Sequence, residues 1–284
     1  MMTIKEALRH AADSLQTDED ARLEAEILLS HVLQVTRTFL YAHANNLLSH
    51  QAHTAFCTLV SARKEGHPIA YLIGAKEFWS LTFSVNASTL IPRPETELLV
   101  EKILALAPED SCHILDLGTG SGAIAIALAH TKPHWHITAT DIATNALNTA
   151  RTNAAQLSLK NIKFIVSDWF DHIPHQHFDV IVSNPPYIEE SDPHLSRGDL
   201  RFEPQQALAS GPDGLDALRI IIHDASNFLK PGGLLIVEHG YKQGIPVKTL
   251  LQQNHFQHIT DDHDLQGHPR VSLGYKAQLF QITL

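Results

Sequence analysis

The sequence predicts an α/β protein in which a doubly wound, mostly parallel sheet follows a small all-helical N-terminal domain. Two observations support this prediction. Short apolar runs alternate with helical patterns from residue 113 to residue 238, and such alternation is typical of a parallel sheet with helices on both faces. Residues 3–74, by contrast, show only the apolar spacing of helices.

The composition limits the class of protein. The 284 residues carry a formal charge of −10, and no run of five lysines or arginines occurs, which argues against direct binding of nucleic acid. The 20 histidines lack paired cysteine ligands or a His-Glu-x-x-His pattern, so we expect no metal. Cys57 and Cys112 are too few for a disulfide framework. With neither a signal-peptide core nor a membrane-length apolar run, we expect a cytoplasmic protein without membrane contact.

The N-terminal domain, residues 1–74, is predicted to be a bundle of helices closed by Gly66 and Pro68. It carries no catalytic pattern, so we interpret it as a substrate-recognition domain. The expected helices lie at residues 4–15, 21–33, 39–44 and 51–65.

A change of pattern marks the link to the second domain. Residues 75–90 predict a β-hairpin linker, because aromatic and β-branched residues partly alternate there. The next segment, Ile-Pro-Arg-Pro-Glu-Thr-Glu at 91–97, places a proline and glutamates where a helix begins. The helix start does not explain Arg93, which stands between two prolines.

The second domain, residues 91–284, contains the predicted sheet. Ligands of such sheets bind at the carboxyl ends of the strands. The expected strands lie at 113–117, 136–141, 162–166, 178–183, 233–238, 256–260, 270–275 and 278–283, and the expected helices at 123–129, 146–157, 215–229 and 243–254.

Candidate cofactor-binding residues follow three of these strands. They are Gly118, Thr119, Gly120, Ser121 and Gly122 after the first, Asp141 after the second, and Asp168 with Trp169 after the third. The glycines formally fit a dinucleotide fingerprint, so hydride transfer is one hypothesis. However, carboxylates at Asp116, Asp141 and Asp168 would repel a pyrophosphate and attract sulfonium and ammonium groups. This favours S-adenosylmethionine, with Asp141 on the ribose hydroxyls and Asp168 and Trp169 beside the adenine.

The fourth strand ends in Asn184, Pro185, Pro186 and Tyr187. Prolines lack an N–H and keep the preceding residue extended, so this turn offers carbonyl acceptors and few donors. A planar NH2 group needs two acceptors, which the Asn184 side-chain oxygen and a neighbouring carbonyl would supply. Tyr187 adds a flat face for stacking. We therefore interpret the four residues as a catalytic and substrate-binding motif that orients a nitrogen nucleophile, with Asn184 also beside the cofactor.

With this motif, the chain resembles the class I amino-methyltransferases, and within them the glutamine methyltransferases of peptide chain release factors. The resemblance extends over nearly the full length. It rests on the helical N-terminal domain, the aromatic hairpin, and the segments at 91–97, 116–122, 184–188, 201–204 (Arg-Phe-Glu-Pro) and 213–215 (Asp-Gly-Leu).

The resemblance implies methyl transfer from S-adenosylmethionine to the glutamine side-chain amide in the Gly-Gly-Gln loop of a bacterial release factor. The Asn-Pro-Pro-Tyr string also occurs in enzymes that methylate exocyclic base amines, so a nucleic-acid amino-methyltransferase is the alternative enzyme. A third hypothesis is a non-catalytic adaptor that binds a partner through its helical domain.

Overall fold

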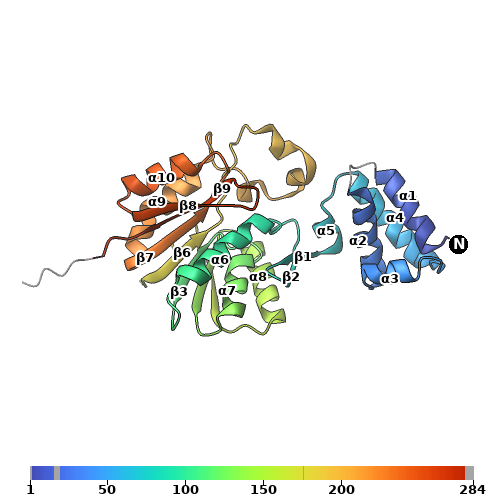
Figure 1. Ribbon diagram of the computed structural model, residues 1–284, viewed down its shortest axis with the longest axis horizontal. Helices are drawn as coiled ribbons and strands as arrows, with labels where there is room; N and C mark the ends of the chain where they lie inside the picture. Colours follow the sequence, from blue (N-terminus) through green and yellow to red (C-terminus); the bar gives the residue numbers. More distant parts are fainter. Residues whose placement is uncertain (1, 16–19, 175, 279–284) are drawn as a thin grey trace, which may run out of the picture. The chain divides into compact units, whose positions relative to one another are not determined.

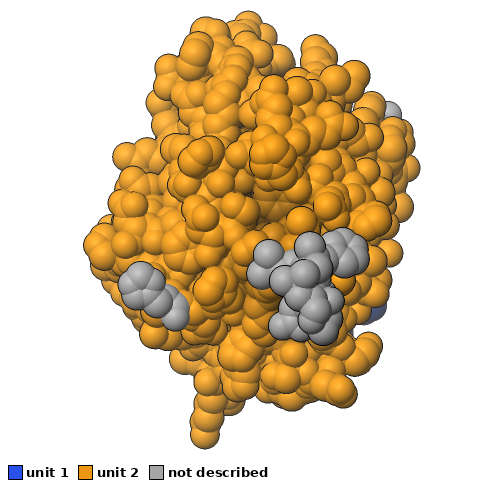
Figure 2. All heavy atoms as spheres, turned by 90° about the vertical axis from the view of Figure 1, so that its left-hand side faces the viewer, with its two compact units in different colours: residues 1–75, 198–202 blue, residues 76–197, 203–284 orange. Residues whose placement is uncertain are grey.

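The computed structural model describes residues 2–15, 20–174 and 176–278 (Figure 1). The chain divides into two compact units, and Figure 2 shows the surface of the larger one in orange. The smaller unit consists of residues 1–75 and 198–202, and the larger consists of residues 76–197 and 203–284. None of the helices in the described ranges combines the length and apolar character needed to cross a bilayer.

The smaller unit is a helical bundle around an apolar core. Serine and threonine residues cap two of its helices: Thr36 accepts a hydrogen bond from the N–H of Phe39, and Ser49 from that of Ala52. Pro68 precedes a further short helix instead of closing the bundle, because proline is well tolerated where a helix starts. The helices are α1 (Ile4–Leu15), α2 (Ala21–Leu33), α3 (Arg37–Ala42), α4 (His50–Lys64) and α5 (Ile69–Ile73).

A short segment from much later in the chain, Gly198–Phe202 (η3), belongs to this helical unit. Asp199 accepts a hydrogen bond from Arg63 at 2.8 Å, and Arg63 is also paired with Glu24 at 2.6 Å. The Phe202 ring lies 4.2 Å from that of His67, measured between centroids. The sequence places this segment in the second domain, and its packing partners are visible only in the structure.

The larger unit contains a seven-stranded sheet with the order β5-β4-β3-β6-β7-β9-β8. Strands β5, β4, β3, β6 and β7 are parallel, and β9 is antiparallel to both β7 and β8. The strands are β3 (His113–Leu117), β4 (His136–Asp141), β5 (Ile162–Val166), β6 (Phe178–Ser183), β7 (Leu229–Glu238), β8 (Gln257–His263) and β9 (Pro269–Tyr275).

Helices cover both faces of this sheet, which confirms the predicted fold class. Helices α6, α7 and α8 lie on one face and α9 and α10 on the other (Figure 1). The second group packs on leucine, isoleucine and valine side chains of β3, β6 and β7. The helices are α6 (Glu97–Leu106), α7 (Ala123–Thr131), α8 (Thr144–Gln156), α9 (Asp216–Phe228) and α10 (Gly244–Gln253), with 3₁₀ turns η1 (Pro94–Thr96), η2 (Pro193–Ser196) and η4 (Gln205–Ala207).

Two strands extend well beyond their predicted bounds: β8 ends at His263 instead of residue 260, and β7 starts earlier. Strand β7 begins at Leu229 instead of residue 233, because an irregular register beside β6 accommodates Pro231 and Gly232 within the strand. The strand predicted at 278–283 lies outside the described residues, apart from Gln278, which is not in a strand.

One buried amide helps to attach the hairpin of β1 (Ala75–Phe78) and β2 (Leu81–Ser84) to the sheet domain. Asn153 of α8 accepts a hydrogen bond from the Ser84 N–H at 2.8 Å and donates to the Ser84 carbonyl at 3.1 Å. Its amide also donates to the Ser121 carbonyl at 2.9 Å. A single side chain therefore connects the hairpin to the glycine-rich loop.

Replacing Asn153 by alanine should lower the free energy of unfolding by roughly 2–4 kcal/mol, because part-buried backbone groups of Ser84 and the buried carbonyl of Ser121 lose their partner. Denaturant titration measures this change. Asn148→Ala is the matched control, since Asn148 is exposed on the same helix. Equal stability of the two variants would contradict the proposed connection.

Candidate active site

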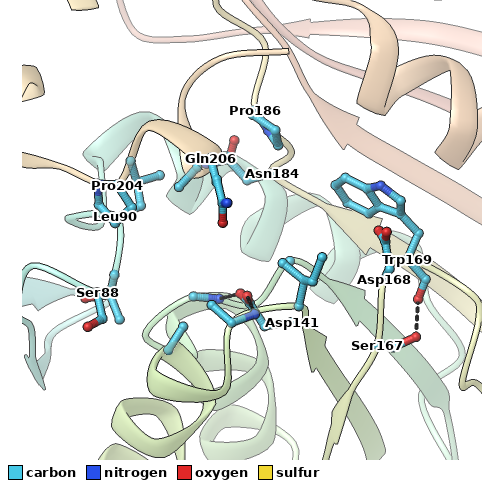
Figure 3. Close-up of a pocket in the computed structure, with 17 residues that line it drawn as sticks. Ser88, Leu90, Asp141, Ser167, Asp168, Trp169, Asn184, Pro186, Pro204 and Gln206 are labelled. Carbon is cyan, nitrogen blue, oxygen red and sulfur yellow. Dashed lines mark hydrogen bonds between the residues drawn. The ribbon is translucent and has the colours of Figure 1, made fainter. Parts of the chain in front are cut away.

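A pocket opens in the larger unit at the carboxyl ends of β3, β4, β5 and β6 (Figure 3). It holds about 760 Å³ of empty space, including its open mouth. Leu90 and Pro204 lie on the side opposite Trp169. The lining residues are Ser88, Thr89, Leu90, Gly118, Gly120, Asp141, Ile142, Ala143, Ala146, Ser167, Asp168, Trp169, Asn184, Pro186, Pro204, Gln206 and Ala207.

The glycine-rich loop forms the wall next to β3. Gly118 and Gly120 have φ angles of +69° and +57°, in the left-handed region that favours glycine. Both line the pocket, and a Cβ atom added to Gly120 would meet no protein atom within 4 Å. The loop therefore leaves its backbone open to a ligand.

Asp141 fixes the adjoining wall, at the end of β4. One carboxylate oxygen accepts the Gly120 N–H at 2.9 Å and the other accepts the Ala143 N–H at 2.8 Å. Burial raises the pKa of Asp141, while these two N–H donors act to lower it. The carboxylate lone pairs not used by the backbone suit the hydroxyl groups of a ribose.

The wall after β5 consists of Asp168 and Trp169. The Asp168 carboxylate is exposed, and the indole of Trp169 is half-buried, so a charge and a flat apolar face stand side by side (Figure 3). Trp169 has an unusual φ of +40°, and its carbonyl accepts a hydrogen bond from the Ser167 hydroxyl at 2.9 Å.

Three sequence-predicted residues lie behind this surface rather than on it. Thr119, Ser121 and Gly122 do not line the pocket. Asp116, which the charge argument placed at the pocket, is fully buried inside β3 and accepts a hydrogen bond from Thr119 at 2.6 Å. Burial raises the pKa of Asp116 to about 7. The charge argument for the cofactor therefore rests on Asp141 and Asp168.

Asn184 and Pro186 bring the predicted catalytic and substrate-binding motif to the pocket (Figure 3). The Asn184 amide nitrogen donates to the Thr96 hydroxyl at 3.0 Å, and its oxygen accepts no hydrogen bond within the described part of the chain. Pro185 is buried. Tyr187 packs on the core below and its hydroxyl donates to Glu238 at 3.2 Å. The structure thus places Asn184 at the pocket and Tyr187 beneath it.

Of two further segments that carry the family resemblance, one holds the segment at residues 91–93 and the other packs against this turn. Buried Glu203 accepts hydrogen bonds from the Ile91 N–H at 2.9 Å and from Arg93, which gives the arginine between two prolines its partner. At Gly214, φ is +72° and an added Cβ would lie 2.3 Å from the Tyr187 carbonyl oxygen, so only glycine fits. Both segments therefore hold the walls of the pocket.

The sequence is similar to known proteins over nearly its whole length. Family models of a methyltransferase domain and of a PrmC N-terminal domain match residues 108–276 and 6–74. The release factor glutamine methyltransferase of Coxiella burnetii is 45% identical over 279 residues, 98% of this chain and 100% of that protein. The Escherichia coli protein of the same name is 45% identical over 94% of this chain and 96% of its own length.

The chain belongs to the release factor glutamine methyltransferases.

A solved methyltransferase from Pyrococcus furiosus is similar in fold to this family member, with a TM-score of 0.54 at 18% identity over 78% of this chain and 98% of that one.

The sequence did not predict Leu90, Ile142 and Gln206 as lining residues of the pocket. It also did not predict Thr96 and Glu238 as residues that support Asn184. Thr96 and Glu238 adjoin recognised elements, but a single sequence gives no signal that their side chains meet. Among the described residues, no cluster of three His, Cys, Asp or Glu side chains is suited to a metal.

Asp141→Ala should weaken binding of S-adenosylmethionine about 10- to 150-fold, because it removes charge-assisted hydrogen bonds. Calorimetric titration gives the affinity. Asp171→Ala is the control, since Asp171 is exposed three residues after Asp168 and does not line the pocket. Unchanged affinity in the Asp141 variant would refute the assignment of this carboxylate.

Proposed function

We propose that this protein methylates the side-chain amide nitrogen of the glutamine in the Gly-Gly-Gln loop of bacterial peptide chain release factors. One observation carries the proposal: Asn184 lines the pocket with its NH2 group bonded to Thr96 and its oxygen unused by the described protein groups. An acceptor in that position suits a substrate that presents an N–H. Membership of the family supports the same substrate.

The methyl donor is S-adenosylmethionine, and the pocket fits it. When bound, this cofactor supplies a methyl group on a positively charged sulfur. Asp141 and Asp168 provide negative charge and hydrogen-bond acceptors, and Ile142 and Trp169 provide apolar surface for an adenine. The open backbone at Gly118 and Gly120 permits close approach. This combination suits a cationic nucleoside better than a pyrophosphate.

Orientation is the main problem in this reaction, because delocalisation of the lone pair makes an amide nitrogen a poor nucleophile. The Asn184 oxygen and the Pro185 carbonyl would accept the two N–H bonds of the substrate amide. They would hold the nitrogen toward the methyl group and stabilise the positive charge that the nitrogen acquires. Proton loss to water then follows methyl transfer. Alignment of reacting groups is worth about 7–11 kcal/mol in well-ordered systems.

The substrate glutamine lies in a flexible loop that offers little surface, so binding energy must come from contacts remote from the reacting atom. We assign this role to residues 1–74, which contain no catalytic group. Residues 75–90 are the linker, and residues 91–284 are the methyltransferase domain.

A reducing cytoplasm is the compartment that fits the cysteines, because both exposed Cys57 and buried Cys112 are free thiols.

Radiolabelled methyl transfer tests the proposal. Label should enter an intact release factor and should be absent from a factor in which the Gly-Gly-Gln glutamine is replaced by alanine. A nucleic-acid methyltransferase would instead label DNA or RNA, with activity that falls steeply as salt rises. Labelled nucleic acid, or equal labelling of the two factors, would contradict the proposed substrate.

Asn184→Ala should lower turnover by about 10²–10³-fold, the usual loss for one group that stabilises transition-state charge. The melting temperature should change little. Single-turnover kinetics measures the effect, and Asn148→Ala is the control with wild-type turnover. An active Asn184→Ala enzyme would contradict the assigned role.

A further inference from the structure

Thr96, which accepts a hydrogen bond from the Asn184 side chain, belongs to a buried network of hydrogen bonds. Asn184 donates to the Thr96 hydroxyl at 3.0 Å, and that hydroxyl donates to one carboxylate oxygen of Glu238 at 2.7 Å. The other Glu238 oxygen accepts the Tyr187 hydroxyl at 3.2 Å. Thr96 is 4% exposed and Glu238 is 1% exposed, so water does not compete for these bonds.

A role in building the helix does not explain Thr96. This residue occupies the N-cap position of α6, where a threonine hydroxyl usually accepts a hydrogen bond from the first turn. Here the side chain makes no capping bond. Its hydroxyl is directed instead to Asn184 and Glu238.

The chain of bonds has a direction, which is set at Glu238. An ionised carboxylate only accepts hydrogen bonds, so the Thr96 hydroxyl must donate its hydrogen to Glu238. The Thr96 oxygen is then an acceptor for a second donor, and the Asn184 NH2 group supplies that donor. The Asn184 oxygen is left for the pocket. With the opposite direction, the Asn184 NH2 group would face the substrate amide, donor against donor.

We propose that Glu238, acting through Thr96, is a positioning residue that fixes the orientation of the Asn184 amide and thereby presents its oxygen to the substrate. This inference rests on the proposed function and adds a second layer to its site. Neither Thr96 nor Glu238 lines the pocket, so both act through Asn184.

Burial of the Glu238 carboxylate is unfavourable. Burial raises the pKa of Glu238 to about 7, the hydrogen bonds from Thr96 and Tyr187 and the charge of Arg270 lower it, and the charge of Glu95 raises it. Tyr187 remains a donor, since burial and the neighbouring Glu238 raise the pKa of its hydroxyl while Arg270 and Arg93 oppose the shift. The direction of the hydrogen bonds from Asn184 through Thr96 to Glu238 is therefore sensitive to pH near neutrality.

Substitution of Thr96 gives the first test. Thr96→Val keeps the shape and removes the hydroxyl, so turnover on release factor should fall about 10²-fold, as for a misplaced reacting group, with KM changed by less than about threefold. Thr96→Ser keeps the hydroxyl and should restore turnover to within about threefold of wild type. Melting temperature and S-adenosylmethionine affinity verify that each variant is folded.

The pH profile gives the second test. Turnover of the wild-type enzyme should rise as pH passes about 7, where Glu238 becomes ionised. Glu238→Gln cannot ionise, so its turnover should not show this rise. Stability should change in the opposite sense: the raised carboxyl pKa lowers wild-type stability as pH rises from about 4.5 to about 7, and Glu238→Gln should remove that dependence too.

Several outcomes would overturn the inference. One is wild-type turnover in Thr96→Val, and another is an equal loss of turnover in Thr96→Ser and Thr96→Val. The third is a Glu238→Gln enzyme whose turnover still rises as pH passes about 7. If Thr96→Val fails to fold, Thr96→Ser and the Glu238→Gln pH profile still decide the question. A wild-type enzyme that does not label release factor would refute the proposed function instead, so the two failures are distinguishable.

Discussion

The parallel register of β6 and β7 is the constraint on which the rest of the site depends. Ser183 pairs with Val237, so the next residues lie side by side: Asn184 just past the end of β6, and Glu238 as the last residue of β7. The first lines the pocket, and the second stays buried beneath it. Thr96, where η1 meets α6, spans them with one hydroxyl. An amide is nearly symmetrical in shape, so only such a network determines which end of Asn184 faces a ligand.

The remaining walls follow from the same sheet edge. Asp141 leaves β4 and is fixed by two backbone N–H groups, while the left-handed glycines after β3 leave the backbone bare. The loop after Asn184 returns to the pocket through Glu203, which joins it to Arg93. The pocket thereby combines acceptors for a cationic cofactor with an acceptor for an N–H substrate, and methyl transfer to nitrogen needs both.

The sequence predicted the positions of single site residues better than the contacts between residues that are distant in sequence. Strand ends and the glycine loop follow from local patterns, so Asp141 and Asn184 could be identified as site residues from one sequence. Glu238 could not be identified as a site residue from the sequence, because its partner Thr96 lies 142 residues away. Asp116 was placed at the pocket because it precedes the glycines, but the strand continues past it and buries it. Residues 198–202 belong to the helical unit through an ion pair and a ring contact that no local pattern indicates.

The orientation of the Asn184 amide is the central claim, and neutron diffraction of the enzyme with S-adenosylhomocysteine and a release factor measures it directly. Deuterium positions distinguish the NH2 group from the oxygen. The account predicts that the Asn184 oxygen accepts an N–D of the target glutamine and that its ND2 group faces Thr96. An Asn184 ND2 group directed at the substrate, with its oxygen on Thr96, would contradict the account.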